Sequence, residues 1–82
     1  MKFKAKVANK NMADYLKNLR RERNYTMRVV AEKINMPHSF IGKTEQLTRR
    51  MDVGEFVHYC YALDQDPIAA LKDIMALQQD IE

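Results

Sequence analysis

The sequence predicts an all-α protein with five helices joined by short turns. Only two Gly and two Pro occur among its 82 residues, and a chain with so few breakers favours helices over many short strands. Apolar residues recur at helical spacing along most of the chain. Residues that favour helix starts and ends stand between these apolar stretches, so the helix boundaries can be placed.

The first eleven residues are expected to form a basic arm, followed by a single domain at 12–82. The arm contains Lys2, Lys4, Lys6 and Lys10 and little apolar content, and terminal segments of this kind are often poorly ordered. Such lysines either follow a nucleic-acid backbone or minor groove, or only add solubility. The residues alone leave both interpretations open.

The first helix is predicted at Met12–Arg23. Met12, Tyr15, Leu16 and Leu19 recur at the spacing of one helix face. Asn24 suits the left-handed position that often follows a helix, where Asn is the usual substitute for Gly. The helix is therefore expected to end just before Asn24.

Two short helices are expected next, at Met27–Ile34 and His38–Gln46. Thr26 is a good N-cap for the first of them, and Asn35 stands where a helix-ending residue belongs. Pro37 blocks continuation of that helix and favours the start of the following one. The segment therefore predicts a helix, a tight turn and a second helix.

Two further helices complete the predicted fold. Asp52 and Glu55 have the spacing of a capping box, which opens a helix at Val53–Leu63. Asp66-Pro67 repeats the start signal and opens a last helix at Pro67–Gln79. The apolar residues of this last helix exceed what a four-helix core needs, which indicates an interface between two copies. The candidate interface residues are Ile74, Leu77 and Ile81.

The composition argues against several classes of protein. The single cysteine, Cys60, excludes an internal disulfide and any cysteine-rich zinc module. No apolar run is long enough for a membrane span, and no signal-peptide pattern follows the basic start. We expect a cytoplasmic, nucleoid-associated protein that needs neither a metal nor a cofactor.

A catalytic function is not expected. His58 and Cys60 are two residues apart on a predicted helix, so they point to different faces. No glycine-rich phosphate loop and no pair of carboxylates with catalytic spacing is present. The chain is therefore predicted not to be an enzyme.

Charge is distributed unevenly along the chain. Residues 1–51 carry thirteen Lys and Arg against four acids, whereas residues 52–82 carry one Lys against seven acids. The net charges of the two parts are therefore +9 and −6. This asymmetry points to a polyanion on one side of the molecule, although solvated helix faces can also differ in sign by chance.

The segment Thr26–Gln46 has the layout of a helix-turn-helix unit, in which two helices meet at a steep angle. In that unit the second helix enters the major groove of DNA with its first residues toward the base edges. The helix that begins at His38 is therefore the expected reader.

The sequence from Leu16 to Leu71 resembles the Xre/Cro, or lambda-repressor-like, helix-turn-helix family. The segments that carry the resemblance most clearly are 39–45 and 49–56, and their register fits without gaps. The supporting residues are Leu19, Arg20, Val30, Ala31, Ile34, Met36, Ser39, Ile41, Lys43, Glu45, Arg49 and Arg50. The resemblance implies a compact five-helix lambda-repressor-like domain.

The resemblance also implies roles for single residues. Arg20 is expected to form an ion pair with Glu45, which would tie the reader helix to the first helix. The expected base readers are His38, Ser39, Lys43 and Phe40. His38 could instead contact a phosphate or solvent, and Phe40 could touch a thymine methyl group or pack in the core or an interface. The expected phosphate ligands are Thr26, Met27, Arg28, Thr44, Thr48, Arg49, Arg50 and Arg20.

Three positions are unusual. Family members commonly have Gln at the position of Met27, where it contacts a phosphate and braces the reader, and Gly at the position of Leu47. Met27 therefore puts one phosphate contact in doubt, and Leu47 puts the closure of the turn after the reader in doubt. Gly42 lies inside the reader helix, where Gly costs about 1 kcal/mol relative to Ala. We expect it to give clearance for a close approach to DNA.

Taken with the resemblance, these features predict a transcriptional regulator, a repressor, that binds a palindromic operator in double-stranded DNA as a homodimer. The alternative is an antitoxin-type module that neutralises a toxin and autoregulates its operon. A phage switch and a restriction–modification controller are also compatible with the residues.

Overall fold

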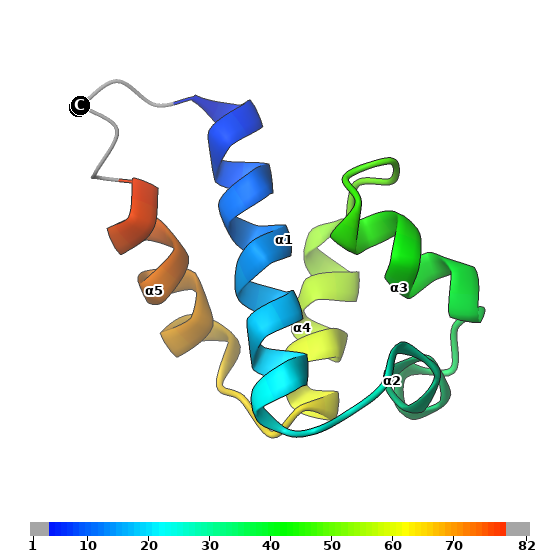
Figure 1. Cartoon of the computed structure of the whole chain (residues 1–82). Coiled ribbons are helices and arrows are strands. Elements are labelled where there is room, and N and C mark those ends of the chain that lie inside the picture. The colour runs from blue at the N-terminus through cyan, green and yellow to red at the C-terminus, as the bar shows by residue number, and fades with distance from the viewer. Residues whose placement is uncertain (1–3, 79–82) are drawn as a thin grey trace.

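The computed structural model describes residues 4–78, which form five α-helices and contain no strand (Figure 1). This confirms the predicted all-α fold class. The helices are α1 (Ala5–Glu22), α2 (Met27–Ile34), α3 (His38–Glu45), α4 (Val53–Ala62) and α5 (Pro67–Gln78). The bounds of α2–α5 agree with the predicted ones to within one residue.

The first helix begins much earlier than predicted. Helix α1 starts at Ala5, so within the described residues the expected arm is helical. Ala and Lys favour helices, and Lys10 donates to Asp14 one turn later, with 2.8 Å between Nζ and Oδ2. The helix also packs beside α5 along its length (Figure 1). Lys2 lies outside the described residues.

The predicted helix-end signals are confirmed around α2. The Thr26 hydroxyl accepts a hydrogen bond from the Val29 amide at 3.1 Å. Asn24 and Asn35 have φ angles of 58° and 55°, in the left-handed region that Asn tolerates better than most residues. These residues end α1 and α2 sharply and fix the entry into the helix-turn-helix.

The turn after α3 is closed by a Schellman motif. Leu47 has φ 63°, and its amide donates to the Thr44 carbonyl at 3.2 Å. The Thr48 amide donates to the Lys43 carbonyl at 2.9 Å, which completes the motif. A leucine therefore occupies the left-handed position that usually belongs to Gly, and the closure left in doubt by Leu47 is made without glycine.

Helix α4 opens with the predicted capping box. The Asp52 carboxylate accepts from the Glu55 amide at 2.7 Å, and the Glu55 carboxylate accepts from the Asp52 amide at 3.0 Å. Asp66 acts similarly before α5, because its Oδ1 accepts from the Ile68 amide at 3.0 Å. These side chains satisfy amides that the first helical turns leave without partners.

The core lies between all five helices. The largest fully buried side chains are Tyr59, Leu16, Ile41, Leu63, Val30 and Cys60. Helix α2 packs on α3 and α4, and α5 packs on α1 and α4. Burial of these side chains supplies most of the favourable free energy of folding.

One predicted interface residue is part of this core. Ile74 is only 5% exposed, packed with Ala70 against α1 and α4, so it is not available to a second copy. The sequence-based prediction failed because Ile74 faces the same side of α5 as Ala70, one turn earlier. The apolar side chains that α5 leaves exposed are Ile68, Leu71, Met75 and Leu77. Ile81 lies outside the described residues.

Candidate nucleic-acid interface

Helix α3 has one exposed face and one buried face. His38, Ser39 and Lys43 are exposed, and their side chains make no hydrogen bond or ion pair within residues 4–78. The opposite face carries the buried residues Phe40, Ile41 and Thr44. Three of the expected base readers therefore lie together on the outer face of one short helix.

Phe40 is not a base reader. It is 4% exposed and belongs to the hydrophobic core. The ring is covered from outside by the guanidinium of Arg49, whose central carbon lies 4.5 Å from the ring centroid. Of the roles left open for Phe40, core packing is the correct one.

Thr44 is not positioned as a phosphate ligand. The residue is 2% exposed, and its hydroxyl is buried without a hydrogen-bond partner among the described residues. Thr44 lies one turn after Phe40 and Ile41, so it shares their inward face. The expected contact with DNA is therefore wrong at this position.

Arg20 forms the ion pair with Glu45 that the resemblance implies. Arg20 Nε lies 2.7 Å from Glu45 Oε2, and Nη2 lies 3.1 Å from Oε1. Nη1 donates to the Tyr25 carbonyl at 2.9 Å. The hydrogen bond with Glu45 raises the pKa of Arg20 above its ordinary value. Because Arg20 is 8% exposed and its guanidinium faces inward, it is not a phosphate ligand.

The remaining phosphate candidates lie at the start of α2 and in the loop after α3. Arg28 and Arg50 are exposed, with no side-chain partner in the described part of the chain. The Thr26 hydroxyl caps α2, and the Thr48 hydroxyl donates to the Lys43 carbonyl at 3.3 Å. Both threonines are exposed.

Met27 lies beside Gly42 where α2 packs on α3. A Cβ atom added to Gly42 would lie 3.9 Å from the Met27 sulfur, an ordinary van der Waals distance. Met27 is half-buried, so its side chain packs against the reader helix instead of reaching outward. Met27 therefore makes an apolar contact with α3 at a position where a Gln side chain is common.

Arg49 has a partner that the sequence analysis missed. Its Nη1 and Nη2 atoms donate to Glu55 Oε1 and Oε2 at 3.1 and 2.9 Å. This pairing lowers the pKa of Glu55 and raises that of Arg49. Arg49 is therefore already paired within the protein, although it was expected to be a phosphate ligand. The Arg49–Glu55 pair spans a loop of irregular backbone, and no pattern in the sequence predicts such a pair.

A search of solved structures finds a similar chain, described as an "XRE-family like protein from Pseudomonas syringae pv. tomato str. DC3000". The two share 32% identity over 89% of each chain, with a TM-score of 0.84. The protein belongs to the XRE family. No protein-family model matches the sequence, and a comparison with curated proteins finds no match.

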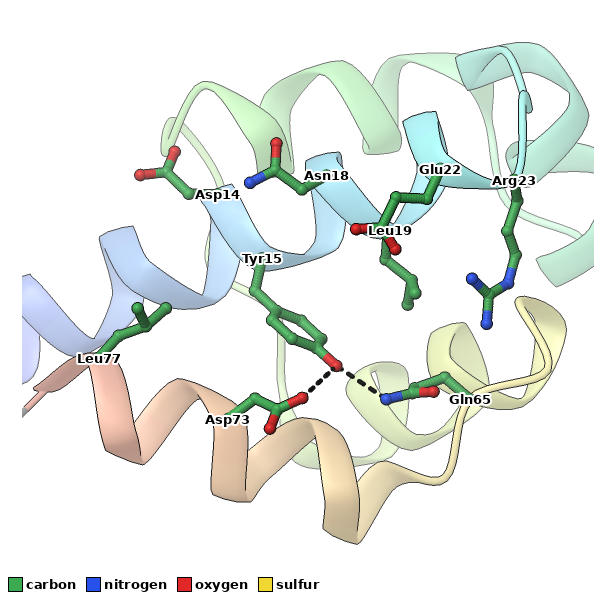
Figure 2. Close-up of a pocket in the computed structure, with 9 residues that line it drawn as sticks. All are labelled: Asp14, Tyr15, Asn18, Leu19, Glu22, Arg23, Gln65, Asp73 and Leu77. Carbon is green, nitrogen blue, oxygen red and sulfur yellow. Dashed lines mark hydrogen bonds between the residues drawn. The ribbon is translucent and has the colours of Figure 1, made fainter.

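This XRE-family protein has a second polar region, between α1 and α5 and away from α3 (Figures 1 and 2). Tyr15 donates to Asp73 at 3.1 Å and accepts from Gln65 at 2.8 Å. Burial and the bond to Asp73 raise the pKa of Tyr15. These bonds hold α5 and the preceding turn against α1. The pocket beside them is lined by Asp14, Tyr15, Asn18, Leu19, Glu22, Arg23, Gln65, Asp73 and Leu77.

Within 4–78, no group of three or more His, Cys, Asp or Glu side chains is placed to hold a metal ion. No helix in the same range is long and apolar enough to cross a membrane.

Proposed function

We propose that this XRE-family protein is a sequence-specific regulator of transcription that binds double-stranded DNA with α3 in the major groove. The observation that carries the proposal is the exposed face of α3, where His38, Ser39 and Lys43 stand without partners among the described residues. The family's helix-turn-helix fold supports it, because the second helix of such a unit is the one that reads base edges.

Each exposed side chain on α3 has a chemistry suited to base edges. Lys43 can donate to the O6 and N7 atoms of guanine. Ser39 can donate or accept, and His38 can do either as a neutral ring. Lys43 therefore has the most definite expected partner, whereas Ser39 and His38 are adaptable.

Phosphates are bound from both sides of α3 in this proposal. Arg28 stands in the first turn of α2, where the amides of Met27 and Arg28 have no partner in their own helix. Amides at a helix start favour an anion. Arg50, with Thr48, supplies the contact from the loop after α3. These groups would fix the position of α3 on the duplex without reading its sequence.

We also propose that the protein acts as a homodimer on a palindromic operator and represses transcription by occupying it. One helix as short as α3 reads only a few base pairs, and two copies one DNA turn apart, about 34 Å, would double the contacts. The apolar face formed by Ile68, Leu71 and Met75 of α5 is exposed and supports an interface there. Leu77 is also exposed and remains a candidate.

Selection of bound sequences from a pool of random duplexes tests the proposal. We expect a single enriched motif with two inverted half-sites, whose centres lie about 10 base pairs apart. A lack of enrichment would contradict sequence-specific binding. A motif with one half-site would contradict the dimer but leave α3 as the reader.

The dimer itself is tested by sedimentation of the free protein and of its complex with the selected duplex. Leu71→Glu should shift the free protein toward monomer, because it places a charge on the exposed apolar face of α5. Tyr61→Glu is the matched control, since Tyr61 is an exposed large side chain on α4. A wild-type protein that is monomeric both free and on DNA would contradict the homodimer.

A further inference from the structure

The side chain of Arg49 joins α3 to α4. Its guanidinium lies over the Phe40 ring, on α3, and holds both carboxylate oxygens of Glu55, in the first turn of α4. Nη1 also donates to the carbonyl of Arg50 at 3.2 Å. One side chain therefore contacts the reader helix, the loop and the following helix.

The loop backbone around Arg49 is tied to α3 as well. The amides of Thr48 and Arg49 both donate to the carbonyl of Lys43, at 2.9 and 3.3 Å. Lys43 is the proposed guanine reader, so the residue that should contact a base is bonded through its own carbonyl to the loop that Arg49 holds. A change in the Arg49–Glu55 pair would therefore shift the backbone of Lys43.

The donors of Arg49 are largely committed to the protein. Of the five N–H groups of a guanidinium, three are used by Glu55 and by the Arg50 carbonyl. The carboxylate also neutralises the charge that would attract a phosphate. The neighbouring Arg50 is exposed and has no side-chain partner within residues 4–78.

We propose that Arg49 is a positioning residue that sets the aim of α3 through Phe40 and the Lys43 carbonyl, and that Arg50 is the loop cation that meets the phosphate. This inference rests on the proposed DNA-binding function. Removing the Arg49–Glu55 pair should weaken discrimination between sequences, whereas removing Arg50 should weaken binding to every sequence.

Two substitutions isolate the pair without removing its neighbours. Arg49→Lys keeps the positive charge but loses the planar fork that engages both carboxylate oxygens. Glu55→Gln removes the charge of the partner but preserves the capping box, since Gln serves at that position as well as Glu. Surface ion pairs contribute little stability, so both variants are expected to fold, which thermal melting verifies. Arg50→Gln is the matched control.

The measurement is the affinity of each variant for two duplexes across a range of salt concentrations. One duplex carries the motif selected with the wild-type protein, and the other is a scramble of the same composition. We expect Arg49→Lys and Glu55→Gln each to reduce the ratio of the affinities for the two duplexes about tenfold, because a displaced base contact loses about that much discrimination. The slope of affinity against salt concentration should be unchanged in both variants. Arg50→Gln should leave the ratio unchanged and reduce the slope by about 0.9.

Other outcomes would overturn the inference. If Arg49→Lys keeps the full ratio while Arg49→Gln reduces the salt slope as Arg50→Gln does, Arg49 is a phosphate ligand. If Glu55→Gln tightens binding to both duplexes and leaves their ratio unchanged, the pair restrains Arg49 from DNA instead of aiming α3. If the wild-type protein enriches no motif, the proposed function fails first, so the two failures are distinguishable.

Discussion

Arg20 and Glu45 form a two-pronged ion pair between α1 and the last residue of α3, with Nε 2.7 Å from Oε2 and Nη2 3.1 Å from Oε1. The side chains are 9% and 3% exposed. Buried pairs of this kind fix geometry more than they add stability. Here the pair fixes the C-terminal end of the proposed reader helix to the longest helix of the fold.

Arg20→Ala should lower the free energy of unfolding by about 3–5 kcal/mol, because it leaves the Glu45 carboxylate buried without a partner. Urea unfolding measures this loss. Arg21→Ala is the control, because Arg21 is exposed in the same turn of α1 and its loss should change the stability little. Equal losses in the two variants would show that the pair does not matter to stability.

Lys43→Ala and Ser39→Ala should each weaken the preference for one base at one position of the selected motif. The loss of binding free energy that distinguishes this base from the others should be about 1–3 kcal/mol for a direct contact. Titration of single-base variants of the motif measures this change. Lys72→Ala is the control, because Lys72 is exposed on α5. Equal effects of Lys43→Ala on the motif and on scrambled DNA would assign Lys43 to a phosphate.

Leu47→Gly should stabilise the protein by about 1 kcal/mol, since a left-handed backbone costs a residue with a Cβ roughly 1–2 kcal/mol. Leu47 has φ 63° and is 45% exposed, so little burial is lost with the side chain. Leu71→Gly removes a similarly exposed leucine from the interior of α5, and there the change should destabilise by about 1 kcal/mol. Melting temperatures that fall in both variants would contradict a strained Leu47.

Cys60 should resist alkylation in the folded protein at pH 8 and react after unfolding in urea. It is fully buried, and burial raises the pKa of its thiol to about 11. An unfolded thiol has a pKa of about 8.5. The unfolded protein therefore loses this proton at a lower pH than the folded protein, so the stability of the fold declines as the pH rises from about 8.5 toward 11. Rapid labelling under native conditions would contradict the buried site.

The same residue gives a second readout. Between pH 8 and pH 10 the wild-type protein should lose more stability than Cys60→Ala, by no more than about 1.4 kcal/mol per pH unit. If the two proteins lose stability in parallel over this range, the thiol does not titrate as its burial requires.

The sequence predicted most helix boundaries because local chemistry sets them. Thr26, Asp52 and Pro37 act within one turn of their own position, and the structure has the helices that they indicate. The start of α1 was missed because its N-cap residue, Lys4, is not a typical capping residue and does not cap the helix through its side chain. In this early part of α1, Ala8 and Asn9 line a pocket together with Leu71 and Ile74 of α5, a neighbour that the local sequence does not reveal.

The candidate site was less predictable than the fold. Resemblance supplied both the Arg20–Glu45 pair and the candidate readers His38, Ser39 and Lys43. The structure places these three readers on the exposed face of α3. Ile74 was expected at an interface, and Phe40 was left open between a base contact and packing. Both side chains are buried, because periodicity in a short or strongly apolar helix does not separate its faces. The Arg49–Glu55 pair depends on how an irregular loop folds, which no residue pattern encodes.

In the proposed function the exposed face of α3 enters the groove of a duplex. Amide chemical shifts of the isotope-labelled protein, recorded as the selected duplex is added, report which residues meet the DNA. We expect the largest changes at His38–Lys43, at the start of α2 and at Arg50, with little change on α5. Changes centred on α5 or on the pocket beside Tyr15, with α3 unaffected, would contradict binding of DNA through α3.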